Sequence, residues 1–150
     1  PWLVRLAYGL TGDWGHAEDL AQAALTRALI SWSRLRRADD ANAYLRKILI
    51  NANRSRFRKR RVAETGAAGI EELAVADRTE EFEQRSVMVA ALMELPPRQR
   101  AVVVLRYWEG LTETQAAEIL GCSPGTVRST ASDALRALRG RIEQTEGERS

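Results

Sequence analysis

The side chains of this chain that point most directly to a function are its arginines and lysines, because many of them cluster in one segment. Six of the eight residues in Arg54–Arg61 are basic, which is more positive charge than the C-terminal end of a helix needs to balance its dipole. Like charges at this density repel one another unless an anion neutralises them, so the run predicts contact with a nucleic acid. The alternative interpretation is a solvated helix end or a localisation tag.

Residues that could catalyse a reaction or hold a metal are scarce. The chain has one His, His16, and one Cys, Cys122, which excludes a zinc site built from these residue types and a disulfide framework within the chain. We interpret His16, in the polar stretch GDWGHAED, as a turn residue rather than a rigidly held base. Cys122 is interpreted as a small turn residue, with a redox switch as the alternative. The sequence therefore predicts no catalytic residue, no metal and no cofactor.

Charge is unevenly distributed along the chain. Residues 1–61 carry 13 basic and 5 acidic side chains, a balance of +8, and residues 62–84 carry 1 basic and 7 acidic, a balance of −6. Residues 85–150 carry 9 basic and 8 acidic side chains, a balance of +1. These blocks predict two functional units, 1–61 and 85–145, joined by a flexible acidic linker over 62–84. A short helix within the linker is expected around Ile70–Val75.

Composition is typical of a globular protein, with 45% hydrophobic and 29% charged residues among 150. No apolar run approaches the roughly 20 residues of a membrane helix, and the start of the chain lacks the pattern of a secretory signal. We therefore expect a cytoplasmic protein without membrane insertion. The first predicted helix begins abruptly at the N-terminus, so we also expect that residues precede Pro1.

Apolar residues recur with the helical period and no alternating strand pattern is evident, which predicts an all-α fold of two small helical domains. The first unit should contain helices over Leu3–Leu10 and Ala17–Trp32, a polar loop over Arg34–Asn42, and a third helix that Asn42 caps and that runs into the basic residues. The inward stripe of the second helix is predicted to be Ala17, Leu20, Ala21, Ala24, Ala28, Leu29 and Trp32. That of the third is predicted to be Tyr44, Leu45, Ile48, Leu49 and Ala52.

The second unit should begin with a helix from Gln84 to Glu94, which Pro96 and Pro97 end. The next helix is predicted to end at Gly110. The apolar side of the first of these helices is predicted to be Val87, Ala91, Leu92 and Leu95. The second carries Val102, Val103, Leu105, Tyr107 and Trp108.

A helix-turn-helix follows. Thr112 and Gln115 form a predicted capping box, and Gly121 suits the left-handed residue that ends a helix. Ser123 is a predicted N-cap with Pro124 in the first helical position, and the second helix should run to about Ile142. A short helix, a tight turn and a longer helix are the plan of a DNA-binding helix-turn-helix, with an ordinary helical hairpin as the alternative. The inward residues of the longer helix are predicted to be Val127, Ala131, Leu135 and Leu138.

The first turns of that longer helix should face a major groove. Arg128 suits a guanine or a phosphate, and the absence of a side chain at Gly125 lets the backbone approach DNA. The hydrogen-bonding residues predicted beside them are Ser123, Thr126, Ser129 and Ser132.

With these segments in order, the chain resembles the extracytoplasmic-function (ECF) sigma factor family, most closely its actinobacterial branch. The resemblance rests on AEDLAQAALTRAL (Ala17–Leu29), AYLRKILINANRSRFRKRR (Ala43–Arg61) and LPPRQRAVVVLRYWEGLTETQAAEILGCSPGTVRS (Leu95–Ser129). It implies a domain over 1–61 that binds core RNA polymerase and the −10 element. It also implies a domain over 85–145 that binds the −35 element of promoter DNA, and it admits an anti-sigma factor as a further partner.

The resemblance also implies roles for individual residues. The polymerase-binding residues are Glu18, Asp19 and Gln22. The loop Arg36–Asn42 would receive an unstacked base. The DNA-binding residues outside the helix-turn-helix are Asn42, Tyr44, Arg46, Lys47, Asn51, Arg54, Arg58, Lys59 and Arg106.

The chain departs from the family at Thr130 and Asp133, where relatives often carry Arg, and in a shorter N-terminal helix. Two other classes of protein compete with this interpretation. A different helix-turn-helix regulator would lack the segment Ala17–Arg61. A nuclease would need clustered carboxylates or histidines, whereas the dense acids of this chain lie in the predicted linker.

Overall fold

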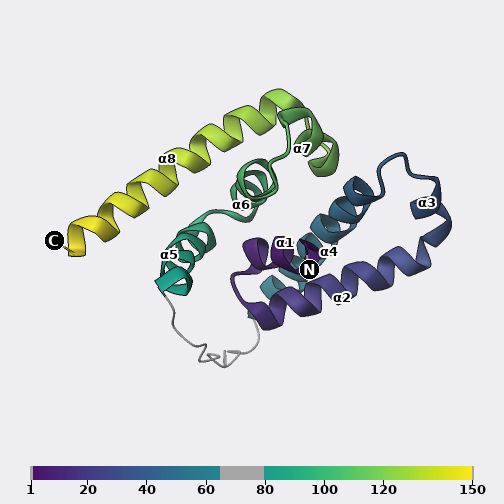
Figure 1. Ribbon diagram of the computed structural model, residues 1–150, viewed down its shortest axis with the longest axis horizontal. Helices are drawn as coiled ribbons and strands as arrows, with labels where there is room; N and C mark the ends of the chain where they lie inside the picture. Colours follow the sequence, from purple (N-terminus) through teal and green to yellow (C-terminus); the bar gives the residue numbers. More distant parts are fainter. Residues whose placement is uncertain (1, 65–79, 150) are drawn as a thin grey trace.

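The computed structural model describes residues 2–64 and 80–149, and every regular element in these two ranges is a helix (Figure 1). The all-α prediction is therefore confirmed. The N-terminal half contains α1 (Trp2–Thr11), α2 (Trp14–Ile30), α3 (Trp32–Arg37) and α4 (Ala41–Glu64). The C-terminal half contains α5 (Glu80–Glu94), α6 (Pro97–Val103), the π-helical turn η1 (Val104–Trp108), α7 (Glu113–Leu120) and α8 (Pro124–Arg149). The predicted helix at Ile70–Val75 lies outside the described residues.

In the N-terminal half, α2 packs against both α1 and α4. Asp13 caps α2, because its Oδ1 accepts a hydrogen bond from the His16 backbone N–H at 2.9 Å. His16 thus belongs to the first turn of a helix rather than to the turn that the sequence predicts. The largest side chains of this core, fully buried, are Leu6, Leu10, Leu20, Leu49 and Ile50.

Three predictions for the N-terminal half are wrong. Leu29 and Trp32 are 70% and 52% exposed, since α2 ends at Ile30 and the chain turns before it reaches any partner for them. The stretch Arg34–Asn42 is only partly a loop, because α3 continues to Arg37. Asn42 does not cap α4: Asp40 does, accepting the Ala43 N–H at 3.1 Å.

In the C-terminal half α6 and α7 pack against α8, and α5 reaches its later part, where the Arg141 Nη1 lies 2.9 Å from the Glu94 Oε2. Helix α5 begins at Glu80, earlier than the predicted Gln84, and α8 continues past the predicted end at Ile142 to Arg149. Leu135 is exposed, and Ala134 takes the buried position predicted for it. The helix after Pro97 ends at Trp108, before the predicted end at Gly110, and its last turn widens into η1, where the Glu109 N–H bonds the Val104 carbonyl at 2.9 Å.

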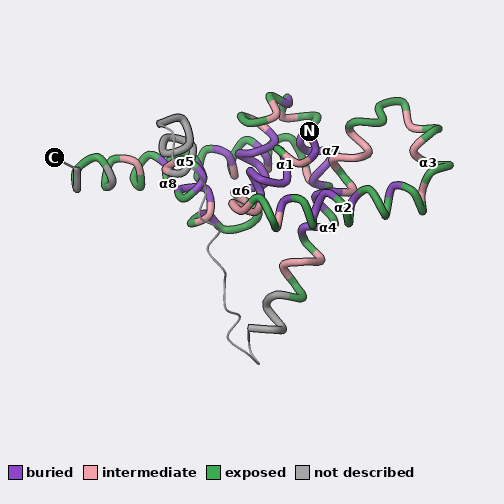
Figure 2. The backbone as a smooth tube through the Cα atoms, turned by 60° about the horizontal axis from the view of Figure 1, so that its bottom comes forward, coloured by how far each residue is buried: buried purple, intermediate pink, exposed green. Residues whose placement is uncertain are grey.

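The two halves share one hydrophobic core within the described ranges (Figure 2). Gly12 has a φ of +73°, and a Cβ there would lie 2.7 Å from the Met93 side chain of α5. The Arg100 guanidinium bonds the Leu92, Met93 and Leu95 carbonyls at 2.8–3.0 Å and the Leu10 carbonyl of α1 at 3.2 Å. Arg100 therefore holds the end of α5 in place and ties it to the N-terminal half.

None of the helices in residues 2–64 and 80–149 combines the length and the apolar composition that a membrane span requires. In the same ranges, no group of three or more His, Cys, Asp or Glu side chains is arranged to hold a metal ion.

Candidate nucleic-acid interface

The helix-turn-helix forms as its local sequence dictates. The Thr112 Oγ1 accepts the Gln115 N–H at 3.1 Å, and the Gln115 side chain accepts the Thr112 N–H at 2.9 Å, so the predicted capping box is present. Gly121 has a φ of +71°, and its N–H bonds the Ala117 carbonyl at 2.8 Å. The Ser123 Oγ then accepts the Thr126 N–H at 3.1 Å and caps α8. These bonds fix the angle at which α8 leaves the turn.

The hydroxyl groups at the start of α8 are largely engaged with one another. Ser123 and Thr126 share a side-chain hydrogen bond of 2.9 Å, and the Ser129 hydroxyl donates to the Thr126 carbonyl at 3.1 Å. Gly125 and Ser132 are exposed. The side chain that extends from this surface is Arg128, which is 74% exposed.

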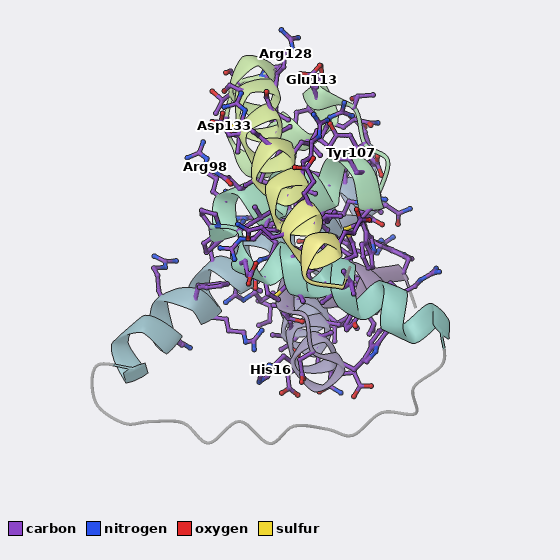
Figure 3. The ribbon with its side chains drawn as sticks, turned by 90° about the vertical axis from the view of Figure 1, so that its left-hand side faces the viewer. His16, Arg98, Tyr107, Glu113, Arg128 and Asp133 are labelled. Carbon is purple, nitrogen blue, oxygen red and sulfur yellow. The ribbon has the colours of Figure 1, made fainter. Side chains whose placement is uncertain are left out.

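Arg128 meets an acid from the other helix of the motif. Its Nε donates to the Glu113 Oε2 at 2.9 Å, and both side chains lie at one end of the molecule in Figure 3. Asp133 lies further along α8 and pairs with Arg136 at 3.9 Å. The sequence analysis missed Glu113, since no local pattern relates it to a residue fifteen positions later.

The basic helix α4 presents its predicted residues in two environments. Asn42, Lys47, Asn51, Arg58 and Lys59 are exposed. Tyr44 is half-buried, and the side chains of Arg60 and Arg61 lie outside the described residues. Two further arginines of α4 contact the C-terminal half: Arg46, which is half-buried, and Arg54, which remains exposed.

Arg46 forms the better-buried of these contacts. Its Nε lies 2.9 Å from the Glu109 Oε1, and the two side chains are 18% and 14% exposed. The Arg46 guanidinium also lies 5.1 Å from the centre of the Trp2 ring, a cation–π arrangement. The Arg54 Nη2 donates to the Leu120 carbonyl of α7 at 3.1 Å. The C-terminal half thus binds two of the side chains predicted to contact DNA.

Arg106 has a structural environment that the sequence did not reveal. Its Nη1 donates to the Leu111 carbonyl, just before the helix-turn-helix, and its guanidinium lies 5.4 Å from the centre of the Tyr107 ring. Arg100, which the sequence analysis did not single out, is 6% exposed, and burial lowers the pKa of its guanidinium. Four backbone carbonyls offset the loss of water around that charge.

The predicted polymerase-binding residues Glu18, Asp19 and Gln22 are all exposed on α2. Leu25 and Leu29 follow Gln22 at intervals of three and four residues, so they extend the same face of the helix, and both are exposed. This α2 face, from Glu18 to Leu29, is polar at one end and apolar at the other. The apolar end of this face is open to contact with another molecule.

Comparison with known proteins gives a family match for each half of the chain. Residues 1–62 match the family described as Sigma-70 region 2, and residues 85–138 match the one described as Sigma-70, region 4. The chain is 38% identical over 141 residues to the RNA polymerase sigma-E factor of Streptomyces antibioticus, covering 94% of this chain and 78% of that protein. It is 34% identical over 145 residues to the ECF RNA polymerase sigma factor SigL of Mycobacterium tuberculosis, covering 91% and 80%.

Solved structures give the same relationship. The sigma factor RpoE of Bartonella quintana, in complex with the anti-sigma factor NepR, superposes with a TM-score of 0.80 at 29% identity, covering 95% of this chain and 91% of that one. CnrH, in complex with the cytosolic domain of CnrY, superposes with a TM-score of 0.67 at 23% identity, covering 95% and 80%.

Proposed function

The chain belongs to the sigma-70 family, in its ECF group, and we propose how its two halves divide the work of a sigma factor. It binds core RNA polymerase and directs promoter recognition and transcription initiation. Residues 1–61 bind the polymerase and the −10 element, residues 85–145 bind the −35 element, and residues 62–84 link them. The observation that carries this division is the capped helix-turn-helix, which presents Arg128 in the same chain as the basic helix α4.

At the −35 element, α8 enters the major groove with its first turns. Arg128 reaches furthest from this surface because the hydroxyls of Ser123, Thr126 and Ser129 are bonded within the turn. Arg128 therefore reads a base edge, while Gly125 lets the backbone approach closely. Ser132 lies one turn further along and contacts the DNA backbone.

At the −10 element, α4 supplies positive charge along one helix. The exposed Lys47, Arg58 and Lys59 contact phosphates, which fix the register of the protein on DNA without reading its sequence. Asn42, Tyr44 and Asn51 lie where they can contact bases that are unpaired during opening.

Arg46 reaches promoter DNA only when the two halves separate. In the arrangement seen here Glu109 holds it, so this closed form and the −10-bound form compete for the same side chain. Arg54 bonds the Leu120 carbonyl but remains exposed, so it can contact DNA in either form. The solved relative RpoE was determined with an anti-sigma factor, and this chain superposes on it over 95% of its length. An anti-sigma partner of this chain would accordingly bind the closed form.

Core polymerase docks on the α2 face defined above. Acidic and amide groups at Glu18, Asp19 and Gln22 orient the contact, and the apolar side chains of Leu25 and Leu29 are buried by it. Asp19→Arg should weaken polymerase binding at least tenfold without unfolding the chain, since Asp19 is exposed. An unchanged affinity would remove Asp19 from the docking face.

Sigma factors are transcription initiation factors rather than enzymes, and we propose no catalytic residue for this chain. We also propose that it acts in the cytoplasm, where core polymerase and promoter DNA are found.

The proposal is tested by adding the full chain to core polymerase and genomic DNA of the bacterium that encodes it, then mapping the 5′ ends of the transcripts. New start sites should appear that share one −35 and one −10 sequence, and they should require the chain. DNA binding without polymerase-dependent transcripts would instead indicate another class of helix-turn-helix regulator.

A further inference from the structure

The pair between Glu113 and Arg128 joins the two helices of the helix-turn-helix at the surface that faces DNA (Figure 3). Glu113 is the first residue of α7, and the capping box of Thr112 and Gln115 fixes its backbone. Its side chain is 30% exposed, whereas that of Arg128 is 74% exposed. A partly buried carboxylate at the fixed start of α7 thus contacts a side chain that otherwise extends into solvent.

The atoms involved determine what Arg128 can still bind. A guanidinium has five N–H donors in a rigid planar fork, one on Nε and four on the two Nη atoms. Glu113 accepts from Nε, and the four N–H donors on the two Nη atoms of this exposed side chain stay available to another partner. Two parallel N–H groups at the end of the fork match the O6 and N7 acceptors of guanine.

Neighbouring groups do not offer Arg128 a comparable partner. The hydroxyls of Ser123 and Thr126 bond each other, and Asp133 lies with Arg136. An acid close to a DNA backbone also weakens binding through repulsion from the phosphates. Glu113 is therefore unfavourable for affinity at this position, unless holding Arg128 in one orientation compensates for the repulsion.

We propose that Glu113 is a specificity-determining positioning residue, which holds Arg128 so that its two Nη groups read one guanine of the −35 element. Glu113 contacts no base itself. It reduces the rotamer freedom that Arg128 loses on binding, so the benefit is largest where the bidentate contact forms. The inference rests on the proposed function of α8 as the reader of the −35 element.

The test uses holoenzyme made from the full chain, on a set of promoters in which each −35 position is changed in turn. Glu113→Gln should reduce the preference for the guanine-containing promoter by roughly 3–10-fold. Glu113→Asp keeps the charge but shortens the reach, so it should lose a similar part of the preference. Glu118→Gln removes an exposed acid from the same helix and should leave the preference unchanged.

Combining Glu113→Gln with Arg128→Ala isolates the interaction between the two residues. Arg128→Ala should abolish the preference, and adding Glu113→Gln should then cause no further loss. Thermal melting of each variant shows whether the fold is retained. Tighter binding of Glu113→Gln to every promoter, with the preference intact, would overturn the inference and leave Glu113 as a repulsive surface charge.

The other failures are distinguishable. If Arg128→Ala weakens all promoters equally, Arg128 reads no base and the inference falls while the sigma function stands. If the wild-type chain forms no promoter-specific holoenzyme at all, the proposed function itself falls.

Discussion

The basic helix α4 and helix α8 of the helix-turn-helix both belong to the proposed DNA interface, but they differ in the side chains that they offer to DNA. Helix α4 exposes Lys47, Arg58 and Lys59, and further arginines line its other sides. The first two turns of α8 hold one long donor, Arg128, among small and hydroxyl residues. Many charges suit phosphate binding, because each further contact adds to the affinity. One oriented arginine suits the recognition of a base.

The two helices also differ in how the rest of the chain supports them. Arg46 of α4 is held by Glu109 in the opposite half of the molecule, so the arrangement of the two halves decides its availability. Arg128 is held by Glu113 within its own motif, so its geometry persists whether the halves are together or apart. The affinity of α4 for DNA can therefore change with the arrangement of the two halves, whereas the specificity of α8 depends only on contacts within its own motif.

The largest effect should come from removing Arg100, whose hydrogen bonds tie the end of α5 to α1 and so join the two halves that carry α4 and α8. Arg100→Ala leaves the carbonyls of Leu92, Met93, Leu95 and Leu10 without their donor, and it should lower the free energy of unfolding by about 3 kcal/mol or more. Urea denaturation measures the change. Arg98→Ala, an exposed neighbour, should cost no more than about 0.5 kcal/mol. A similarly small loss for Arg100 would show that water replaces its bonds.

A second prediction tests whether α8 reads sequence. Arg128→Ala should cost about 1–3 kcal/mol on promoters that carry the recognised guanine, and little on the others. Transcription from a panel of −35 variants measures this, with Arg136→Ala further along the same helix as the control. An equal loss on every variant would make Arg128 a backbone contact and remove the distinction from α4.

A third prediction tests whether α4 acts through phosphates. Replacing Arg58 and Lys59 by Gln should reduce the slope of binding against salt by about two units, roughly one for each lost contact. Between ~50 and ~200 mM salt, the double variant should therefore lose about tenfold less affinity than the wild-type chain loses. The control replaces Arg136 and Arg139 on α8. Altered sequence preference with an unchanged slope would indicate base contacts instead.

The smallest effect concerns regulation of α4. Glu109→Gln removes the acid that holds Arg46, so the free chain should bind DNA about two- to fivefold more tightly. Fluorescence anisotropy with labelled DNA measures the affinity, and Glu118→Gln serves as a control of equal charge. If the two variants bind alike, the closed form does not withhold Arg46 from DNA.

The features of this protein that neighbouring residues form could be predicted from the residue types alone. The capping box of Thr112 and Gln115, the left-handed Gly121 and the cap at Ser123 all depend on bonds across three or four positions, so their residue types are enough to predict them. The helical period likewise predicted most of the buried stripe of α2. The prediction failed at Leu29 and Trp32, where the helix extends beyond its partners.

Contacts between residues far apart in the chain could not be predicted in this way, because they depend on how the helices pack. Glu109 pairs with Arg46, 63 positions away in the sequence, and the Leu10 carbonyl accepts a hydrogen bond from Arg100, 90 positions away. Glu113 meets Arg128 because the turn between α7 and α8 sets the angle of the two helices. No periodicity records such pairs, since they arise from the packing of whole helices. A charged residue therefore looks the same in sequence whether it contacts DNA, a carboxylate or a buried carbonyl.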